Sequence, residues 1–370
     1  MPDQKLALDK DLSRSQHPRR RFLQDAMLMM VGASTAAALP RASAARAASA
    51  NESMNCSSLP TPPMLEVKGK VAFITGGSSG IGLGIARAFS EAGMKVVIGY
   101  KTDQHLAEAM TFLNNASTRV QAIRVDVTDR PAMERAASDV TRLFGKVHVL
   151  VNNAGVFGLA PLRDTTYDDW DWVMNVNVNG VFNGVRAFLP LIQKHGEGGQ
   201  IVTMASAGGL VAGSGVASYI TSKFAVVGMM EALRSELTEA RIGVSVCCPG
   251  AVASNIMNSA RNRPRPLQNT GFDRDPDKRA TVEGLLKNPE LAMDPLDVGR
   301  LVLRGMRNNE LYIITHPEFK PLIEARSSAL MASVPSDVHP SDARSAAVGS
   351  SLQSSIYVAE RNRRLCSRGT

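Results

Sequence analysis

The sequence predicts an α/β protein with a single, doubly wound parallel sheet that carries helices on both faces. Short, continuous apolar runs, which suit strands buried on both sides, begin at Val71 and alternate with longer segments of helical periodicity. Alternation at this spacing is typical of β-α-β units joined by right-handed crossovers. Glycine-rich or polar segments follow several of these runs, at the edge where ligand-binding loops collect in open parallel sheets.

Composition excludes some classes of function. The chain has 370 residues, an apolar fraction of 44%, which suffices for a substantial core, and a formal charge of +8. The middle of the chain is closer to neutral and aromatic residues are few, so we expect no nucleic-acid binding. The four cysteines show no zinc spacing and indicate no disulfide framework, and no metal site is predicted. Arginines crowd the two ends instead: Arg19, Arg20, Arg21, Arg41 and Arg46 in front, and Arg361, Arg363, Arg364 and Arg368 behind.

Residues 1–50 are not expected to belong to the fold. The run Arg19-Arg20-Arg21-Phe22-Leu23 precedes a mostly apolar, small-residue stretch, Ala26–Leu39, and a small-residue site at Ala42-Ser43-Ala44. This is the layout of a signal peptide, too short for a membrane span, and it resembles a bacterial twin-arginine export signal. We therefore predict an exported or periplasmic protein with no stable membrane insertion after signal removal. If the leader is not used, the protein is cytoplasmic. Residues 51–65, which contain three prolines, are predicted to form a linker.

A candidate phosphate-binding loop follows the first apolar run, Val71–Ile74. Glycines alternate with small polar residues, and a helical pattern begins directly afterwards. Spaced glycines alone would fit an ordinary turn equally well, but a strand before them and a helix after them favour an anion site at the helix N-terminus. The candidate binding residues are Gly76, Ser78, Ser79, Gly80, Ile81 and Gly82.

The ends of the second and third strands predict which dinucleotide is bound. The second strand runs into Tyr100 and Lys101, with no carboxylate to accept from a ribose 2′-OH. Lys101 can pair with a 2′-phosphate, so NADP(H) is favoured, although a solvated lysine is the alternative interpretation. Asp103 lies near enough to leave NAD(H) open. The third strand ends in Asp126 and Val127, where a carboxylate can meet the adenine amino group.

The stretch Ser206–Lys223 carries the candidate catalytic residues. Tyr219 and Lys223 are an i,i+4 pair, so they share one face of a helix. A fixed ammonium favours the phenolate and lowers the tyrosine pKa toward the working range. Ser206, at the end of a strand-like run, can present a hydroxyl to the same substrate oxygen. A Tyr-x-x-x-Lys pattern alone is weak evidence, because many helices carry both residues on their surfaces.

Taken together, these motifs resemble the short-chain dehydrogenase/reductases over Leu65 to Leu330. The glycine loop, the tyrosine–lysine pair and Ser206 stand in the expected order. The motif Asn152-Asn153-Ala154-Gly155 matches the family's motif at the central strand. Asn177 matches the fourth member of the catalytic set. The last motif is Pro249-Gly250-Ala251-Val252-Ala253-Ser254, with serine in place of threonine. By this resemblance, Asn153, Ala154, Gly155, Pro249, Gly250, Val252, Ser254, Tyr219 and Lys223 join the candidate cofactor-binding residues.

The resemblance implies one Rossmann-type catalytic domain over residues 66–330 and reversible hydride transfer between NAD(P)(H) and a small-molecule ketone or secondary alcohol. Tyr219 would be the general acid/base, Lys223 would hold the ribose and lower the tyrosine pKa, and Ser206 would bind the substrate oxygen. Asn177 would support a proton relay. Family members commonly assemble through the helices after the fourth and fifth strands, which predicts a homodimer or homotetramer. The alternative is a non-catalytic nicotinamide-binding or scaffold protein on the same fold.

The remaining expectations concern the lid and the tail. His148 stands where the family usually has Asp and is predicted to cap a strand edge. Residues 255–293 are predicted to form the substrate lid, whose arginines are either a solvated face or a receptor for an anionic substrate. A helix is predicted over Pro295–Met306 with Asp294 as its N-cap, followed by a strand over Leu311–Thr315. Residues 331–370 are expected to be a disordered tail. The lid arginines are Arg261, Arg263 and Arg265.

Overall fold

The computed structural model describes residues 61–114, 120–267, 280, 283–284, 286–351 and 355–366. The predicted leader (1–50), most of the predicted linker and the middle of the predicted lid (268–279) lie outside the described residues. Within the described ranges, none of the helices combines the length and the apolar character that crossing a membrane requires.

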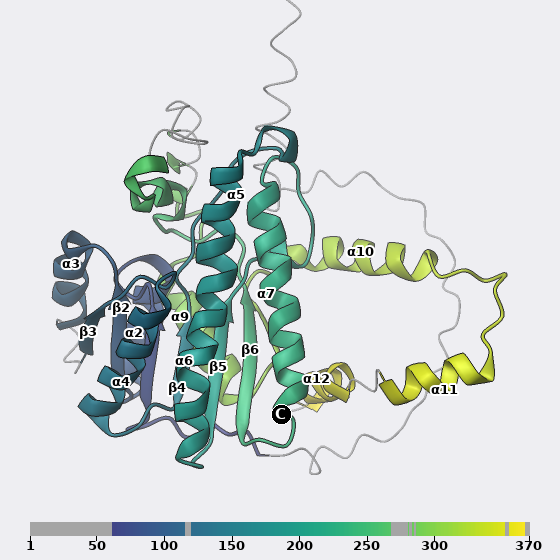
Figure 1. Ribbon diagram of the computed structural model, residues 1–370, viewed down its shortest axis with the longest axis horizontal. Coiled ribbons are helices and arrows are strands. Elements are labelled where there is room, and N and C mark those ends of the chain that lie inside the picture. Colours follow the sequence, from purple (N-terminus) through teal and green to yellow (C-terminus); the bar gives the residue numbers. More distant parts are fainter. Residues whose placement is uncertain are drawn as a thin grey trace, which may run out of the picture.

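Seven parallel strands form one sheet in the order β3-β2-β1-β4-β5-β6-β7 (Figure 1). The chain order reverses between β1 and β4, and in such sheets the ligand crevice opens at the carboxyl ends of the strands at this point. The predicted doubly wound parallel sheet is confirmed. Its strands are β1 (Val71–Thr75), β2 (Lys95–Tyr100), β3 (Val120–Arg124), β4 (Val149–Asn152), β5 (Gly199–Met204), β6 (Ile242–Cys248) and β7 (Tyr312–Ile314).

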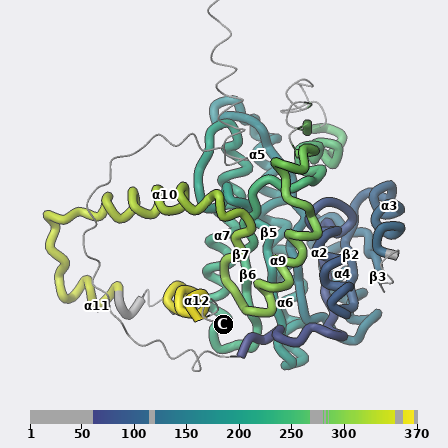
Figure 2. Tube along the Cα trace, turned by 180° about the vertical axis from the view of Figure 1, so that it is seen from behind, coloured from purple at the N-terminus to yellow at the C-terminus, as the bar shows by residue number. Residues whose placement is uncertain are grey.

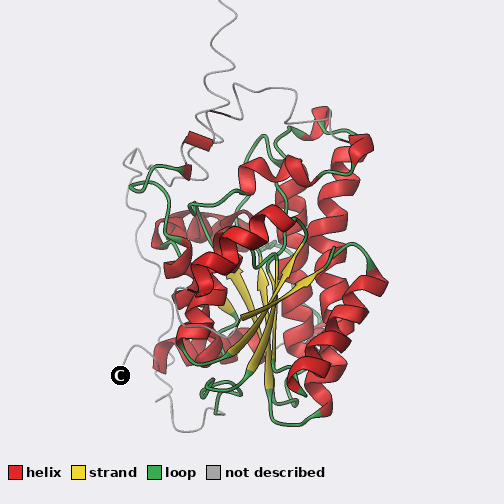
Figure 3. Cartoon of the chain, turned by 90° about the vertical axis from the view of Figure 1, so that its left-hand side faces the viewer, coloured by secondary structure: helices red, strands yellow, loops and turns green. Residues whose placement is uncertain are grey.

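Helices cover both faces of the sheet, as the side view shows (Figure 3). One face packs against α4 (Arg130–Phe144), α6 (Gly180–Lys194) and α7 (Ala217–Glu236), and the other against α2 (Gly80–Glu91), α3 (Asp103–Asn114) and α9 (Pro295–Arg307). Helix α5 (Tyr167–Met174) continues into α6 through a π-helical turn, Asn175–Asn179. Short 3₁₀ turns are Leu162–Asp164 (η2), Ala207–Gly209 (η4), Ile256–Asn262 (η5), Arg265–Leu267 (η6) and Pro317–Phe319 (η8).

Two glycines bring α2 and α9 into close contact. A Cβ on Gly84 would lie 2.1 Å from the Pro295 carbonyl oxygen, and one on Gly299 would lie 2.4 Å from the Gly84 carbonyl oxygen. Asp294 caps α9 as predicted, because its side chain accepts a hydrogen bond from the Leu296 N–H at 2.7 Å. Helix α2, which begins at the phosphate loop, therefore packs closely against α9.

A polar cluster lies at the amino ends of the strands, just before β4 and β5. The Nδ1 of His148 accepts from the first backbone N–H of β1 at 3.2 Å, and its Nε2 lies 3.0 Å from a Glu197 carboxylate oxygen. His195 lies close enough to share an ion with these two side chains. However, Lys146 and Lys70 also bind Glu197, and two ammonium groups repel a cation. We therefore interpret the cluster as the strand-edge cap predicted for His148.

The C-terminal segment differs from the expected disordered tail. Helices α10 (Lys320–Ala332) and α11 (Asp342–Ser351) extend away from the sheet, and α12 (Ser355–Cys366) returns to it beside α7 (Figures 1 and 2). The segment does contain few large apolar residues, which is why disorder was predicted. However, charged side chains hold α12 in place, and a count of apolar residues does not detect them.

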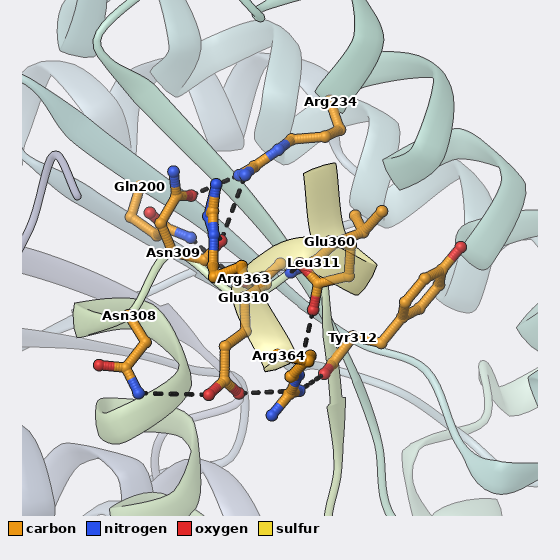
Figure 4. A network of polar contacts seen from close by, with 11 residues as sticks. Gln200, Arg234, Asn308, Asn309, Glu310, Leu311, Tyr312, Glu360, Arg363 and Arg364 are labelled. Carbon is orange, nitrogen blue, oxygen red and sulfur yellow. Dashed lines mark hydrogen bonds and ion pairs between the residues drawn. The ribbon is translucent and has the colours of Figure 1, made fainter. Parts of the chain in front are cut away.

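Helix α12 docks on the edge strand β7 through these charged side chains (Figure 4). The buried Glu360 accepts a hydrogen bond from the Leu311 N–H at 2.9 Å. Arg364 pairs with the buried Glu310 at 2.9 Å and also donates to the Tyr312 carbonyl. Because an open strand edge offers unpaired backbone groups to other strands, α12 protects this edge of the sheet.

The cysteines are only partly as expected. Cys247 and Cys248 are buried free thiols at the end of β6, in agreement with their interpretation as small apolar residues. Cys366, at the end of α12, is disulfide-bonded, which corrects the expectation of no disulfide. Spacing along the chain does not reveal which cysteines the fold brings together.

Candidate active site

The loop between β1 and α2 forms the first wall of a pocket at the carboxyl ends of the strands. Gly76 and Gly80 have φ angles of +62° and +51°, where a side chain would be strained. A Cβ on Gly82 would lie 2.4 Å from both the Gly76 carbonyl oxygen and the Asn153 amide nitrogen. Glycine is therefore needed at these three positions, so that the loop turns tightly enough for a phosphate to reach the α2 N-terminus.

The end of β4 holds this loop in place. Asn153 donates from its side-chain amide to the carbonyls of Thr75 and Gly76, at 2.9 and 3.0 Å. In return, the Thr75 hydroxyl accepts from the backbone N–H groups of Asn153 and Ala154, at 2.9 and 3.0 Å. The Asn-Asn-Ala-Gly motif thus stiffens the phosphate loop from behind while it lines the pocket.

Lys101 and Asp126, which follow β2 and β3, form an ion pair in the pocket lining. Their Nζ and Oδ2 atoms lie 2.7 Å apart. Burial raises the pKa of the Asp126 carboxyl, but hydrogen bonds from Lys101 and Thr128 outweigh it, so that the pKa is lowered overall. Asp103, the carboxylate that left NAD(H) open, pairs with Arg124 at 4.0 Å and lies outside the lining of this pocket.

Tyr219 and Lys223 share one face of α7, beside Ser206 at the end of β5. Ser206 and Tyr219 both line the pocket, and the Ser206 hydroxyl is close enough to lower the pKa of Tyr219. The Lys223 Nζ lies 5.4 Å from the centre of the Tyr219 ring and donates to the Met204 carbonyl at 2.9 Å. The fold thus brings together three of the four predicted catalytic side chains.

Burial dominates the pKa values of this cluster. It raises the pKa of Tyr219 to about 12, against the opposing effect of the Ser206 hydroxyl. It also lowers the pKa of Lys223 to about 8. The expected lowering of the tyrosine pKa is therefore not found in the protein without cofactor. The phenolate would lose its hydration, and the nearby ammonium is turned toward a backbone carbonyl.

Asn177 lies in the π-helical turn between α5 and α6, behind the pocket lining. Its buried side chain accepts from the Val156 N–H at 2.8 Å and donates to the Val156 carbonyl and the Ser222 hydroxyl, both at 3.0 Å. The amide is thus used to hold the loop after β4.

The segment Pro249–Ser254 lines the pocket after β6 and is held by a histidine that the sequence analysis missed. The Nδ1 of His316 accepts from the Gly250 N–H at 3.0 Å, and its Nε2 lies 3.0 Å from the Ala251 carbonyl oxygen. No motif marks His316, because its partners come from a distant part of the chain.

A cavity of about 280 Å³ joins these walls. Among the predicted site residues, Gly82 and Asn177 lie behind its lining. All the others line it: Gly76, Ser78, Ser79, Gly80, Ile81, Tyr100, Lys101, Asp126, Val127, Asn153, Ala154, Gly155, Ser206, Tyr219, Lys223, Pro249, Gly250, Val252 and Ser254.

Known proteins share this arrangement. The family model described as short chain dehydrogenase matches residues 70–265. The chain belongs to the short-chain dehydrogenase family. It is 35% identical to a C alpha-dehydrogenase of Sphingobium sp., over 76% of this chain and 92% of that protein. A short-chain dehydrogenase/reductase from Burkholderia phymatum, solved in complex with NAD, is 31% identical with a TM-score of 0.67, covering 75% of this chain and 99% of that one. The apo form of LigO from Sphingobium sp. is 37% identical with a TM-score of 0.63, covering 78% and 97%.

Apolar side chains form much of the remaining wall of this short-chain dehydrogenase. The ring of Phe157 lies against that of Tyr219, with centroids 4.6 Å apart. The sequence analysis missed these residues, since single apolar side chains on separate elements carry no motif. They include Phe157, Trp172, Val211, Val216, Ile220, Ile256, Leu286 and Phe319.

A buried ion pair attaches the first part of the predicted lid to α5. Arg263 and Asp169 lie 2.6 Å apart, with side chains only 2% and 5% exposed. The Arg263 guanidinium also lies 4.1 Å from the centre of the Trp172 ring. Nearby, the Ser259 hydroxyl accepts from the Phe157 N–H at 2.9 Å. Both sequence interpretations are therefore wrong for Arg263, which is neither solvated nor open to an anionic substrate.

Proposed function

We propose that this dehydrogenase interconverts a carbonyl and a secondary alcohol, with Tyr219 as the general acid/base and NADP(H) as the preferred cofactor. The observation that carries the proposal is that Tyr219, Ser206 and Lys223 line the same pocket, with the Lys223 Nζ 5.4 Å from the centre of the Tyr219 ring. A purely binding protein has no physical need for this buried polar cluster, whose burial has a cost.

The residues of the pocket fit a nicotinamide dinucleotide. The glycines of the phosphate loop leave room for a pyrophosphate to approach the backbone, and the pocket continues from there to both Lys101 and Tyr219. When bound, the cofactor supplies the hydride chemistry. Lys101 lines the pocket whereas Asp103 lies outside its lining, and this difference supports the preference for NADP(H).

Proton transfer is assigned to Tyr219. In reduction, its hydroxyl gives a proton to the carbonyl oxygen while the carbonyl carbon receives the hydride. In oxidation, the phenolate takes the proton back from the alcohol. Ser206 donates to the same oxygen and orients it, and the charge of Lys223 opposes the cost of a buried phenolate. The raised pKa of Tyr219 keeps it protonated and ready to act as an acid at neutral pH.

The substrate in this proposal is an apolar, aromatic-bearing ketone or secondary alcohol. The pocket lining includes Phe157, whose ring packs against Tyr219, and Phe319, and apolar rings of this kind favour contact with a flat ring over contact with a charged group.

Two measurements test the proposal. NADPH and NADH are titrated by fluorescence into the mature protein, and we expect tighter NADPH binding. Tyr219→Phe is expected to lower kcat by about 10³-fold, within the range for losing a general acid, while the NADPH Kd changes less than about twofold. The control is Tyr167→Phe, at a position 91% exposed. A Tyr219→Phe variant that retains most of its rate would falsify the proton-transfer assignment.

We also propose export of the folded protein. The twin-arginine-like leader supports this, and so does the disulfide at Cys366, since such bonds persist in oxidising compartments. Replacing Arg19 and Arg20 by Lys should leave the protein in the cytoplasm in a fractionation experiment. Unchanged periplasmic recovery would contradict this route.

Finally, we propose a homo-oligomer, a dimer or tetramer, built on α6 and α7. Phe182 of α6 is 48% exposed, and a Cβ on Gly228 of α7 would meet only open space, so another copy can pack closely there. Phe182→Arg should lower the mass measured by light scattering. A wild-type protein of monomer mass would end this proposal.

A further inference from the structure

The first part of the lid crosses the pocket from its catalytic end to its ribose end. At the catalytic end, Ile256 packs in one cluster with Phe157 and Tyr219. At the ribose end, the Asn262 carbonyl oxygen lies 3.5 Å from the Nζ of Lys101. The turn η5 between these points therefore lies over the dinucleotide pocket as well as over the substrate wall.

Arg261 lies on this turn and faces the ribose end. It lines the pocket together with Lys101, Thr102 and His105. Its charge is close enough to contribute, after burial, to the lowered pKa of His105. Its guanidinium donates to the carbonyls of Asn255 and Asn258, two hydrogen bonds that orient the group. The sequence analysis considered Arg261 only as part of a solvated lid or as a receptor for an anionic substrate.

The local charge balance explains why Lys101 needs a second cation. Asp126 lies 2.7 Å from Lys101 and its pKa is lowered, so the pair is close to neutral at pH 7. A phosphate monoester carries close to two negative charges at this pH. Arg261 adds a positive charge at this end, and a guanidinium can bind phosphate through two parallel hydrogen bonds.

We propose that Arg261 binds the 2′-phosphate of NADP(H) together with Lys101, so that the turn η5 contacts the cofactor itself. The proposal rests on the NADP(H) preference of the proposed function and adds a ligand from the lid. The buried pair between Arg263 and Asp169 lies two residues further along, so these are positioning residues that hold the turn carrying Arg261.

The test compares Arg261→Gln with Arg265→Gln in the full chain. Arg265 is a matched control, because it is an exposed arginine of the same lid that lies outside the pocket lining. The dissociation constants of NADPH, NADH and adenosine 2′,5′-bisphosphate are measured at low and high salt. We expect Arg261→Gln to weaken NADPH and the bisphosphate about tenfold, or about 1.4 kcal/mol, and NADH less than twofold. The salt dependence of NADPH binding should also fall, and Arg265→Gln should change none of these values.

Other results would overturn the inference in distinguishable ways. Equal weakening of NADPH and NADH would place Arg261 on a group that both share. If the Kd for NADPH is unchanged and the substrate KM at saturating NADPH is raised, Arg261 binds the substrate and not the cofactor. If NADPH is preferred yet Arg261→Gln keeps that preference, only the role of Arg261 fails. If wild-type protein prefers NADH or binds neither, the wild-type titration alone rejects the NADP(H) preference, and the inference with it.

Discussion

The buried pair between Asp169 and Arg263 makes a sharp prediction for Asp169→Asn. The substitution keeps the size of the side chain and removes its charge. Arg263, whose side chain is 2% exposed, then keeps a buried positive charge without its anionic partner 2.6 Å away. The Thr166 hydroxyl, which donates to Asp169 at 2.8 Å, also loses a charged acceptor.

The magnitude follows from the burial of both groups. Removing one partner of a buried ion pair costs about 3–5 kcal/mol, whereas an exposed pair contributes about 0–1 kcal/mol. The lid can open locally and hydrate Arg263, so the measured loss cannot exceed the free energy of that opening. We therefore expect a loss of about 3 kcal/mol if the lid stays closed. A smaller loss of stability must be accompanied by lid opening.

Thermal unfolding and limited proteolysis of the lid separate these two responses. Asp168→Asn is the control, because Asp168 is the exposed neighbour on the same helix. Arg263→Leu and the double variant complete a double-mutant cycle, in which we expect the double variant to lose less stability than the two single variants added together. The reasoning is refuted if Asp169→Asn loses less than about 1 kcal/mol and its lid is cleaved no faster than that of the control.

The remaining predictions concern the Tyr219–Lys223 cluster, the phosphate loop and α12. The kcat/KM of carbonyl reduction should be constant near neutral pH and fall above about pH 8. The reason is that the pKa of Lys223 is about 8, so it loses its charge there, while the pKa of Tyr219 is about 12 and the phenol stays protonated. A value of kcat/KM that stays constant up to pH 10 would contradict this prediction. Between pH 8 and 10.5 the unfolded chain binds more protons at Lys223 than the native state does, so this residue should raise the unfolding free energy with pH. Gly82→Ala should weaken cofactor binding at least about tenfold, since its Cβ would meet a backbone carbonyl at 2.4 Å. The control is Gly284→Ala, where a Cβ would meet nothing within 4 Å, and equal affinities of the two variants would show that the loop can shift. Glu360→Gln should lower the free energy of unfolding by about 1–2 kcal/mol, because the Leu311 N–H loses a charged acceptor, and kcat should not change. The Tm should fall by about 2–4 °C for each kcal/mol lost. Arg361→Gln, at an exposed position of the same helix, is the control, and equal Tm values for the two variants would mean that α12 adds no stability.

Much of the fold was predictable because its signals are local. Runs such as Val71–Ile74 are apolar on both faces, and this pattern belongs to strands of a parallel sheet. The glycine loop was predictable for a similar reason, since Gly76 and Gly80 adopt backbone angles that other residues rarely take. The i,i+4 spacing of Tyr219 and Lys223 already placed them on one face of α7.

The sequence by itself therefore determined the parallel sheet, the tight glycine turn and the shared helical face of Tyr219 and Lys223, because periodicity and backbone preference act over a few residues. Only the tertiary structure decided what surrounds them. His316 behind Gly250, Asp169 beneath Arg263 and Glu360 against Leu311 each join segments far apart in the chain. The raised pKa of Tyr219 depends on the same packing, since burial and its electrostatic consequences exist only once distant elements have excluded water.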